Sequence, residues 1–420
     1  MENPANNDCF GNIRAVARRD LAKRWARRLA VCGLGMLLVF GSYRGYGAWR
    51  KHHLSQQAQD FLARNDYASA VLVARHLLQL DPVNVAACRI MAETASRAGK
   101  QEAVSWCEQV VALEPSVAAN RIALANTALR FGRFDLARRT LDAIDVEGRG
   151  NVKYHELAGT LAIAEKNPVA AESEFAAALQ LDRNNRQLVL NLATVRLTSS
   201  DSATREKARA DLALLVNENG FRLEALRALT TDALATKSLG AAQKWAAQLQ
   251  LEKSATFSDL LLYVEATKGT EVGGVALRNA EAAGARSPAL AAVLITWMNR
   301  HEMARRALDW ALTLPDEILH AAPVPLAVAE CHSFLQDWTG LHGWVDGKDW
   351  RDEEFLRLAV LSHSLHHLTP GDRASMESQT AWNAALKATN NRADRVAAIA
   401  RLAEGWDYAE EAADAWWLIA

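Results

Sequence analysis

The sequence predicts an all-α fold, a solenoid of antiparallel helix pairs, and two observations support this prediction. Ala70, Ala103, Ala137 and Ala171 recur at intervals of 33, 34 and 34 residues, each early in a predicted helix. Half of the 420 residues are hydrophobic and 23% are charged, with only 22 glycines and 9 prolines, so a long core can be buried. A period of this length is typical of helix–turn–helix repeats, in which each unit packs on its neighbours.

The chain begins with a basic segment, residues 1–28, which carries seven lysines and arginines against three acidic residues. An uncharged apolar run from Leu29 to Tyr43 follows, and extension to Trp49 gives 21 residues. A helix of that length spans the hydrocarbon core of a bilayer if Arg44 reaches back to the interface. We therefore predict a transmembrane helix over 29–49.

Two alternatives to an uncleaved anchor stay open for this segment, a cleaved signal peptide and a buried helix. A basic region before a short apolar run fits a signal peptide, but no Ala-x-Ala cleavage site follows it, and the nearest candidate, Gly45-Tyr46-Gly47, is a poor one. The excess of positive charge before the apolar run predicts that the N-terminus is cytoplasmic. The rest of the chain would then lie outside the cytoplasm, in the periplasm if the source is bacterial.

Residues 52–319 are predicted to form the regular part of the array. A turn precedes each repeated alanine, for example Gly132-Arg133-Phe134 before Ala137, and a core residue such as Phe175 follows four positions later. A second small residue, such as Ala125 or Gly159, lies twelve positions before the alanine. Pro82 and Pro115 lie twelve positions after it, where a proline ends one helix and allows the next to begin.

This spacing of small residue, alanine, large apolar residue and proline resembles the tetratricopeptide repeat. The resemblance implies a right-handed superhelical solenoid, extends with drift past Ala208 and Ala242, and returns at Ala304 and Ala412. Residues 320–420 are interpreted as divergent helix pairs, with turns at Trp338-Thr339-Gly340 and at 369–372, for ten or eleven pairs in total. An N-terminal anchor followed by such an array resembles bacterial envelope proteins of this repeat family.

The resemblance also implies a peptide-binding groove lined by chosen positions of each first helix. Carried over to this sequence, its polar residues are Asn126, Arg130, Lys153, Glu156 and Thr160, among apolar neighbours that include Ala92, Ile122 and Ile163. The alternative is that these side chains are simply solvated on an open face. The chaperone-tail clamp of some family members needs a lysine where Ile122 stands, so that specificity is not expected.

Several features were weighed as chemical sites. His363 and His367 share a helical face as two metal ligands would, although no third ligand has a suitable spacing. His155-Glu156-Leu157-Ala158-Gly159 begins like a zinc motif but ends in the glycine that the repeat requires. No nucleophile elbow or phosphate-binding loop occurs. We expect no catalytic residues, no metal, no cofactor and no enzyme activity.

These observations predict a single-pass protein of the inner membrane that acts as a scaffold or adaptor for protein partners at the cell envelope. From residue 55 onward the net charge is −8, which argues against nucleic-acid binding. One alternative is a structural protein that self-associates through its span and its apolar C-terminus, Trp416-Trp417-Leu418-Ile419-Ala420. The other is a metal-binding or enzymatic protein that uses the histidine-rich region 320–391.

Overall fold

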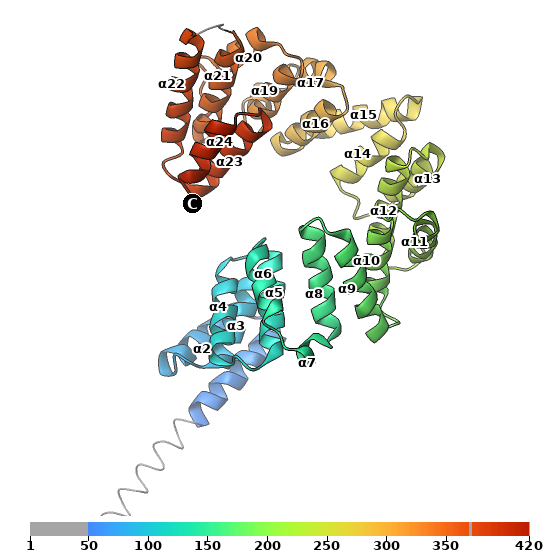
Figure 1. Ribbon diagram of the computed structural model, residues 1–420, viewed down its shortest axis with the longest axis vertical. Coiled ribbons are helices and arrows are strands. Elements are labelled where there is room, and N and C mark those ends of the chain that lie inside the picture. The colour runs from blue at the N-terminus through green and yellow to red at the C-terminus, as the bar shows by residue number, and fades with distance from the viewer. Residues whose placement is uncertain (1–48, 369–371, 420) are drawn as a thin grey trace, which may run out of the picture. The chain divides into compact units, whose positions relative to one another are not determined.

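The computed structural model describes residues 49–368 and 372–419, and within these ranges every regular element is a helix (Figure 1). The first helices of successive pairs are 49–63, α3 (Val85–Arg97), α5 (Ala118–Arg130), α8 (Val152–Ala164), α10 (Arg186–Arg196), α12 (Arg222–Ala235), α14 (Phe257–Ala266), α16 (Pro288–Arg300), α19 (Val324–Phe334), α21 (Glu354–Leu368) and α23 (Ala393–Gly405). The second helices are α2 (Tyr67–Leu80), α4 (Glu102–Leu113), α6 (Phe134–Asp142), α9 (Pro168–Leu181), α11 (Ser202–Leu215), α13 (Leu239–Gln250), α15 (Glu271–Gly284), α17 (Ala304–Ala311), α20 (Trp338–Val345), α22 (Asp372–Ala388) and α24 (Ala409–Trp417). Short helical turns lie between pairs, namely α7 (Val146–Arg149), α18 (Asp316–Leu319) and η2 (Arg351–Glu353).

The local sequence explains where these helices begin and end. Many first helices are followed by a residue of positive φ, which reverses the chain before the second helix; these residues are Asn65, Gly99, Gly132, Lys166, Lys237, Glu302, Gln336 and Asp407. Several helices begin after a side chain that accepts a hydrogen bond from a free backbone N–H; these caps are Asp66, Asn84, Asn151, Asn167, Asn185, Asp201 and Asp337. The predicted turns before Ala70, Ala103, Ala137 and Ala171 are confirmed.

The repeated alanines lie in second helices and are fully buried, as the sequence predicts. They are Ala70, Ala103, Ala137, Ala171, Ala208 and Ala242. The small residues of the first helices are buried as well, and a Cβ placed on Gly159 would lie 2.8 Å from the ring of Phe175. Small side chains at both positions therefore allow the two helices of a pair to pack closely.

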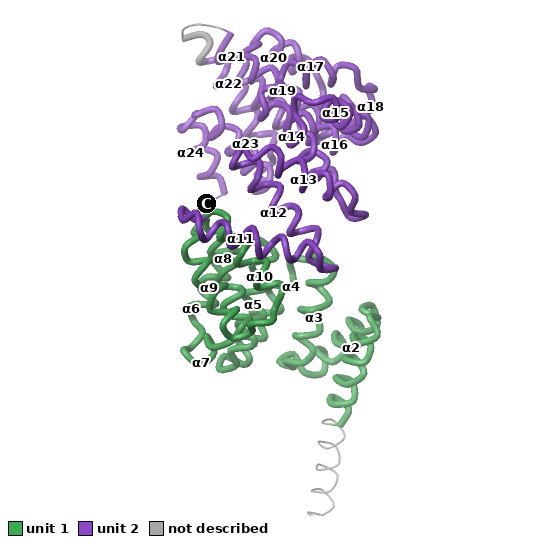
Figure 2. The backbone as a smooth tube through the Cα atoms, turned by 90° about the vertical axis from the view of Figure 1, so that its right-hand side faces the viewer, with its two compact units in different colours: residues 1–198 green, residues 199–420 purple. Residues whose placement is uncertain are grey.

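The chain divides into two compact units, one ending at Thr198 and the other beginning at Ser199 (Figure 2). Of the helix pairs in the described residues, ten lie entirely in either the first or the second unit. The remaining pair is divided, because α10 is the last helix of the first unit and α11 is the first helix of the second. The boundary falls where the alanine period lengthens to 37 residues, between Ala171 and Ala208. The irregularity in the repeat and the division of the chain therefore coincide.

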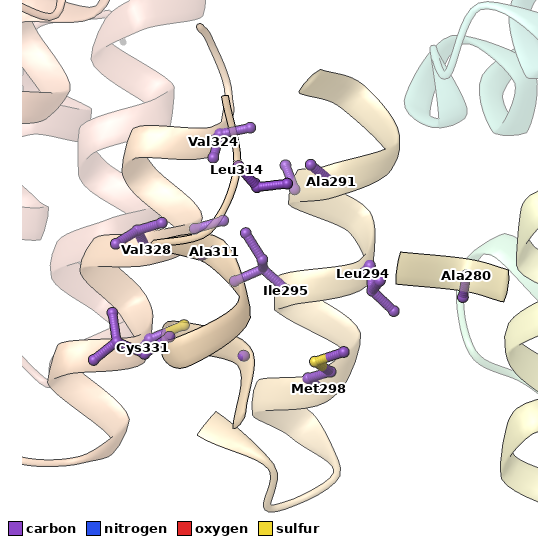
Figure 3. Packing of buried hydrophobic residues seen from close by; sticks show 14 of the residues in the cluster. Ala280, Ala291, Leu294, Ile295, Met298, Ala311, Leu314, Val324, Val328 and Cys331 are labelled. Atoms are coloured by element: carbon purple, nitrogen blue, oxygen red, sulfur yellow. The ribbon is translucent and has the colours of Figure 1, made fainter. Parts of the chain in front are cut away.

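Each unit buries its core between successive helices. In the second unit a large apolar cluster extends from α14 to α19. Figure 3 shows the side chain of Ile295 pointing from α16 toward the helices that carry Ala311 and Cys331. A separate cluster joins α20 to α24 around Trp382, which is fully buried. The predicted divergent region thus forms helix pairs, and its first helix, α19, contributes buried residues to both clusters.

Of the two turns predicted in the region 320–420, one lies elsewhere in the structure. The predicted turn at Trp338-Thr339-Gly340 is wrong in position: these residues form the first turn of α20, and the chain reverses earlier, at Gln336 and Asp337. The side chain of Asp337 accepts a hydrogen bond from the Gly340 N–H, which starts the helix. The other predicted turn, at 369–372, lies almost entirely outside the described residues.

The predicted transmembrane helix over 29–49 and the basic segment 1–28 also lie outside the described residues, except for Trp49. Among the helices of 49–368 and 372–419, none combines the length and the apolar character that crossing a bilayer requires.

The C-terminal residues are divided between two environments. Trp416 donates a hydrogen bond to Glu404 and Ile419 packs on the core, whereas Trp417 is 80% exposed.

Candidate functional site

The first unit contains a hollow on the face formed by its first helices, at the place where the sequence predicts a groove. Its volume is about 650 Å³. It is lined by residues of α3, α4, α5 and the turn before α5: Arg89, Ala92, Glu93, Ser96, Arg97, Cys107, Val110, Val117, Ala119, Asn120, Ala123, Asn126, Thr127 and Arg130. We call this hollow the unit-1 groove. Asn126 and Arg130 of the predicted site both line it.

The arginines of the unit-1 groove are paired with neighbouring side chains. Arg130 donates to the Ser96 Oγ at 2.7 Å, which joins α5 to α3. Arg89 donates to Glu114 at 2.6 Å and Arg97 to Glu93 at 2.9 Å. Glu114 and Glu93 therefore pair with two of the three arginines, and the third, Arg130, is held by a neutral serine.

The other three predicted residues, Lys153, Glu156 and Thr160, lie on α8, which packs beside α5 but does not line the hollow. Lys153 and Glu156 form an ion pair at 3.0 Å, and the Thr160 hydroxyl donates to the Glu156 carbonyl oxygen. The structure thus brings two of the five predicted residues together and places the other three on the next first helix.

The second unit contains two adjoining hollows that the sequence analysis did not predict. One, of about 740 Å³, lies on α14, α16 and α19, and its apolar lining includes Leu261, Leu262, Ala292, Val293, Trp297, Leu326 and Ala327. The other, of about 730 Å³, lies on α19, α21 and α23, and its apolar lining includes Ala329, Phe334, Trp338, Val360, Leu402 and Trp406. Both hollows are lined by Thr296, Arg300, Leu326 and Glu330, so they form one continuous unit-2 groove.

Glu330 lies at the junction of the two hollows and carries the charge that is least solvated there. Its side chain is half-buried, and within the described ranges it has no hydrogen bond or ion pair. Burial raises the pKa of the Glu330 carboxyl above its ordinary value, and the charge of Arg300 offsets part of that increase. Arg300 itself is exposed.

An aromatic and histidine cluster forms one wall of the unit-2 groove. The His363 ring stacks on Trp406 with centroids 4.2 Å apart, and its Nδ1 is 2.9 Å from the Tyr408 hydroxyl. His367 stacks on Trp338 at 3.8 Å. Burial, followed by the neighbouring His367 and His366, lowers the pKa of His363 to about 3. His363 is therefore neutral at physiological pH and acts as a packed aromatic side chain.

The other candidate chemical sites do not assemble in the described residues. No group of three or more His, Cys, Asp or Glu side chains there is arranged to hold a metal ion. Cys88 and Cys107, which share one helix pair, are free thiols. Gly159, which interrupts the zinc-like motif, is packed beneath Phe175 as the repeat requires.

A signal for the unit-2 groove was present in the sequence. Thr296 and Arg300 occupy the ninth and thirteenth positions of α16, which are the positions that Asn126 and Arg130 occupy in α5. Arg401 occupies the ninth position of α23. Extending the register of the predicted site to the later first helices would have found all three. Glu330 lies six residues before the positive-φ residue Gln336, as Asn126 lies six residues before Gly132, so counting back from the turn would have found it too. No such turn residue follows α21 among the described residues, so this register does not reach His363.

The described fold is an array of tetratricopeptide-type helix pairs with grooves along its first helices. No family model matches the sequence, and no curated protein matches it either. Similar solved structures include a tetratricopeptide repeat protein from Parabacteroides merdae, at 13% identity and a TM-score of 0.46, which covers 68% of this chain and 98% of that one. PilF of Pseudomonas aeruginosa is 18% identical with a TM-score of 0.42, over 51% of this chain and 95% of PilF. The structure of the APC/C hetero-tetramer Cut9–Hcn1 contains a chain that is 12% identical, with a TM-score of 0.41. The match covers 88% of this chain and 79% of that one.

Proposed function

We propose that this protein is a membrane-anchored scaffold or adaptor that holds segments of protein partners in its grooves at the cell envelope. The observation that carries this proposal is the unit-2 groove, an elongated hollow in which apolar side chains surround a few polar ones. Such a lining suits an extended or helical segment, because apolar contacts supply affinity and a few polar contacts set orientation.

The membrane placement is part of the proposal and rests on the sequence. Residues 1–28 lie in the cytoplasm, 29–49 cross the inner membrane once, and the array lies in the periplasm of a bacterial cell. The excess of lysine and arginine before the apolar run supports this orientation. An array of net charge −8 beyond residue 55 also favours protein partners over nucleic acid.

Site-specific photo-crosslinking in cells tests the proposal. A photo-reactive amino acid at Val293, which lines the unit-2 groove and is 45% exposed, should form a recurrent crosslink to a distinct protein. The matched control carries the photo-reactive amino acid at Val169 instead. Val169 lies on α9, the second helix of its pair, and is 79% exposed. Equal crosslinking at both positions, or crosslinks only between copies of the chain, would contradict the scaffold function.

Self-association is the second candidate, and one observation favours it. Trp417 and Leu418 are adjacent large apolar side chains that are 80% and 51% exposed, and exposed apolar surface favours a contact with another protein chain. Replacing both with serine should convert an oligomer to a monomer in mild detergent, as measured by light scattering. A wild-type protein that is already monomeric under these conditions would exclude this candidate.

A further inference from the structure

We infer that the unit-2 groove selects a peptide segment that presents an arginine or lysine between apolar residues, with Glu330 as the partner of that cation. This inference rests on the proposed function, since it assumes that the groove binds a protein segment. It adds the chemistry of the residue that is recognised. Three features of the groove lead to it.

The first feature is the position and state of Glu330. Its carboxylate lies where the two hollows meet, is half-buried, and has no hydrogen bond or ion pair in the part of the chain that the structure describes. A carboxylate that loses water without gaining a partner is costly, so an incoming cation recovers more energy there than at a solvated acid. Glu330 is therefore poised to bind a positive group.

The second feature is the aromatic lining beside Glu330. Phe334, Trp338 and Trp406 all line the same hollow as this carboxylate, and Phe334 is 60% exposed. The face of an aromatic ring attracts a guanidinium or ammonium group. A histidine ring covers one face of Trp338 and one face of Trp406, so the exposed ring of Phe334 is the most accessible of the three to a cation. A carboxylate together with aromatic rings recognises a basic side chain better than either does alone.

The third feature is the contrast with the unit-1 groove. There Glu93 and Glu114 are already paired with Arg97 and Arg89, so an incoming cation would have to displace an existing partner. In the unit-2 groove the neighbouring Arg300 is exposed and forms no ion pair with Glu330. The selectivity for a basic residue therefore belongs to the second unit.

The lining on either side of Glu330 specifies what surrounds the basic residue. Leu261, Val293 and Leu326 line one hollow, and Val360 and Leu402 line the other. A segment that lies along the groove therefore contacts apolar side chains before and after its cation. The predicted ligand is an apolar segment with one central arginine or lysine.

Selection from a random linear peptide library displayed on phage tests this inference, with the full-length chain held in mild detergent as the target. Peptides that bind the wild-type chain should be enriched in a basic residue flanked by apolar ones. Glu330→Gln should abolish this enrichment, whereas Glu317→Gln, at an exposed carboxylate of α18 outside the groove, should leave it intact. Glu330→Gln should be at least as stable as the wild type, because the amide has nearly the same shape and removes the cost of a half-buried charge.

A direct binding measurement completes the test. A synthetic selected peptide should bind about tenfold more weakly when its basic residue is replaced by glutamine, as expected for the loss of one hydrogen bond between charged groups. The same replacement should have little further effect on binding to Glu330→Gln, because the cation and the carboxylate act as a pair.

Three results would overturn the inference. These are binding without a preference for basic residues, a preference for acidic residues through Arg300, and recovery of no binding peptide. The proposed scaffold function is tested separately, by the crosslinking experiment at Val293. A groove that crosslinks a partner but shows no charge preference would leave the scaffold function intact.

Discussion

At the scale of single residues, the same residue type has different consequences because packing differs from site to site. A Cβ added to Gly159 would lie 2.8 Å from the Phe175 ring, whereas a Cβ added to Gly240 in α13 would meet no atom within 4 Å. Both glycines lie in helices, so alanine is intrinsically preferred at both positions. Only Gly159 lacks space for a larger side chain, because the Phe175 ring of the neighbouring helix packs against it.

Replacing Gly159 with alanine should therefore destabilise the protein despite the better helix propensity. We expect the free energy of unfolding to fall by about 1–3 kcal/mol, the usual effect of overpacking a core. Gly240→Ala should be neutral or slightly stabilising, by at most about 1 kcal/mol. Urea unfolding followed by circular dichroism measures both, and equal stability of the two variants would show that Phe175 moves aside freely.

His363 shows how tertiary packing changes the protonation of one residue. The ring lies between Trp338 and Trp406, its Nδ1 meets the Tyr408 hydroxyl, and burial lowers its pKa to about 3. The ordinary pKa of histidine is 6.5. Between these values the unfolded chain takes up a proton at this residue that the folded chain does not. Its contribution to stability is therefore complete above pH 6.5 and is lost as the pH falls toward 3.

Replacing His363 with phenylalanine should make stability less dependent on pH in that window. The phenyl ring can still stack on Trp406, although the Tyr408 hydroxyl loses its partner, so the variant is expected to be less stable at neutral pH. Midpoints of urea unfolding measured from pH 7 to pH 4 should fall less steeply than for the wild type. His320→Phe, at an exposed histidine, should retain the wild-type slope. If the midpoints of the His363 variant fell as steeply with pH as those of the wild type, His363 would not be a source of this pH dependence.

At the scale of elements, specific polar contacts hold first helices in register. Asp259 of α14 is buried, and it accepts two hydrogen bonds of 2.8 Å from Arg227 of α12. The same carboxylate accepts hydrogen bonds from the N–H and hydroxyl of Thr256, which caps α14. Burial acts to raise the pKa of Asp259, but these hydrogen bonds outweigh it and the pKa is lowered.

Replacing Asp259 with asparagine should release α14 from α12 and weaken its cap. We expect a loss of about 1.5–3 kcal/mol, as for hydrogen bonds to a charged group. Since the pKa is lowered in the folded state, the contribution is present above the ordinary value of 3.8 and is lost as the pH falls below it. Hydrogen exchange should become faster in α14, whereas Asp309→Asn, at an exposed site of α17, should have no effect. Unchanged exchange in α14 would show that the pair does not hold the two helices together.

At the scale of the whole molecule, the array consists of two units with different grooves. The unit-1 groove contains paired charges, whereas the unit-2 groove is mostly apolar with an unpaired carboxylate. Two distinct grooves on one chain suit a protein that holds partners of different chemistry. This arrangement favours the scaffold interpretation over a chemical role for the region 320–391, whose histidines are packed against aromatic rings.

The proposed orientation in the membrane gives a prediction at the same scale. Protease added to sealed spheroplasts should digest the array, because residues beyond the predicted span are expected to lie outside the cytoplasm. A cytoplasmic marker protein should survive the same treatment, and should be digested only after the membrane is permeabilised. An array that stays protected in sealed spheroplasts would reverse the proposed orientation.

The sequence by itself determined the helix pairs, because each pair needs small residues where its helices cross and turn residues between them. Ala137, Gly159 and the turn at Gly132 carry this information locally, within about 34 residues of one another. The same register located Asn126 and Arg130 in a groove, since both lie on one face of one helix. The same register, counted back from Gln336, also reaches Glu330, but tertiary structure alone decided what surrounds it. Glu330 lies on α19, His363 on α21 and Trp406 just after α23, and their burial depends on how irregular pairs stack, which no local period records.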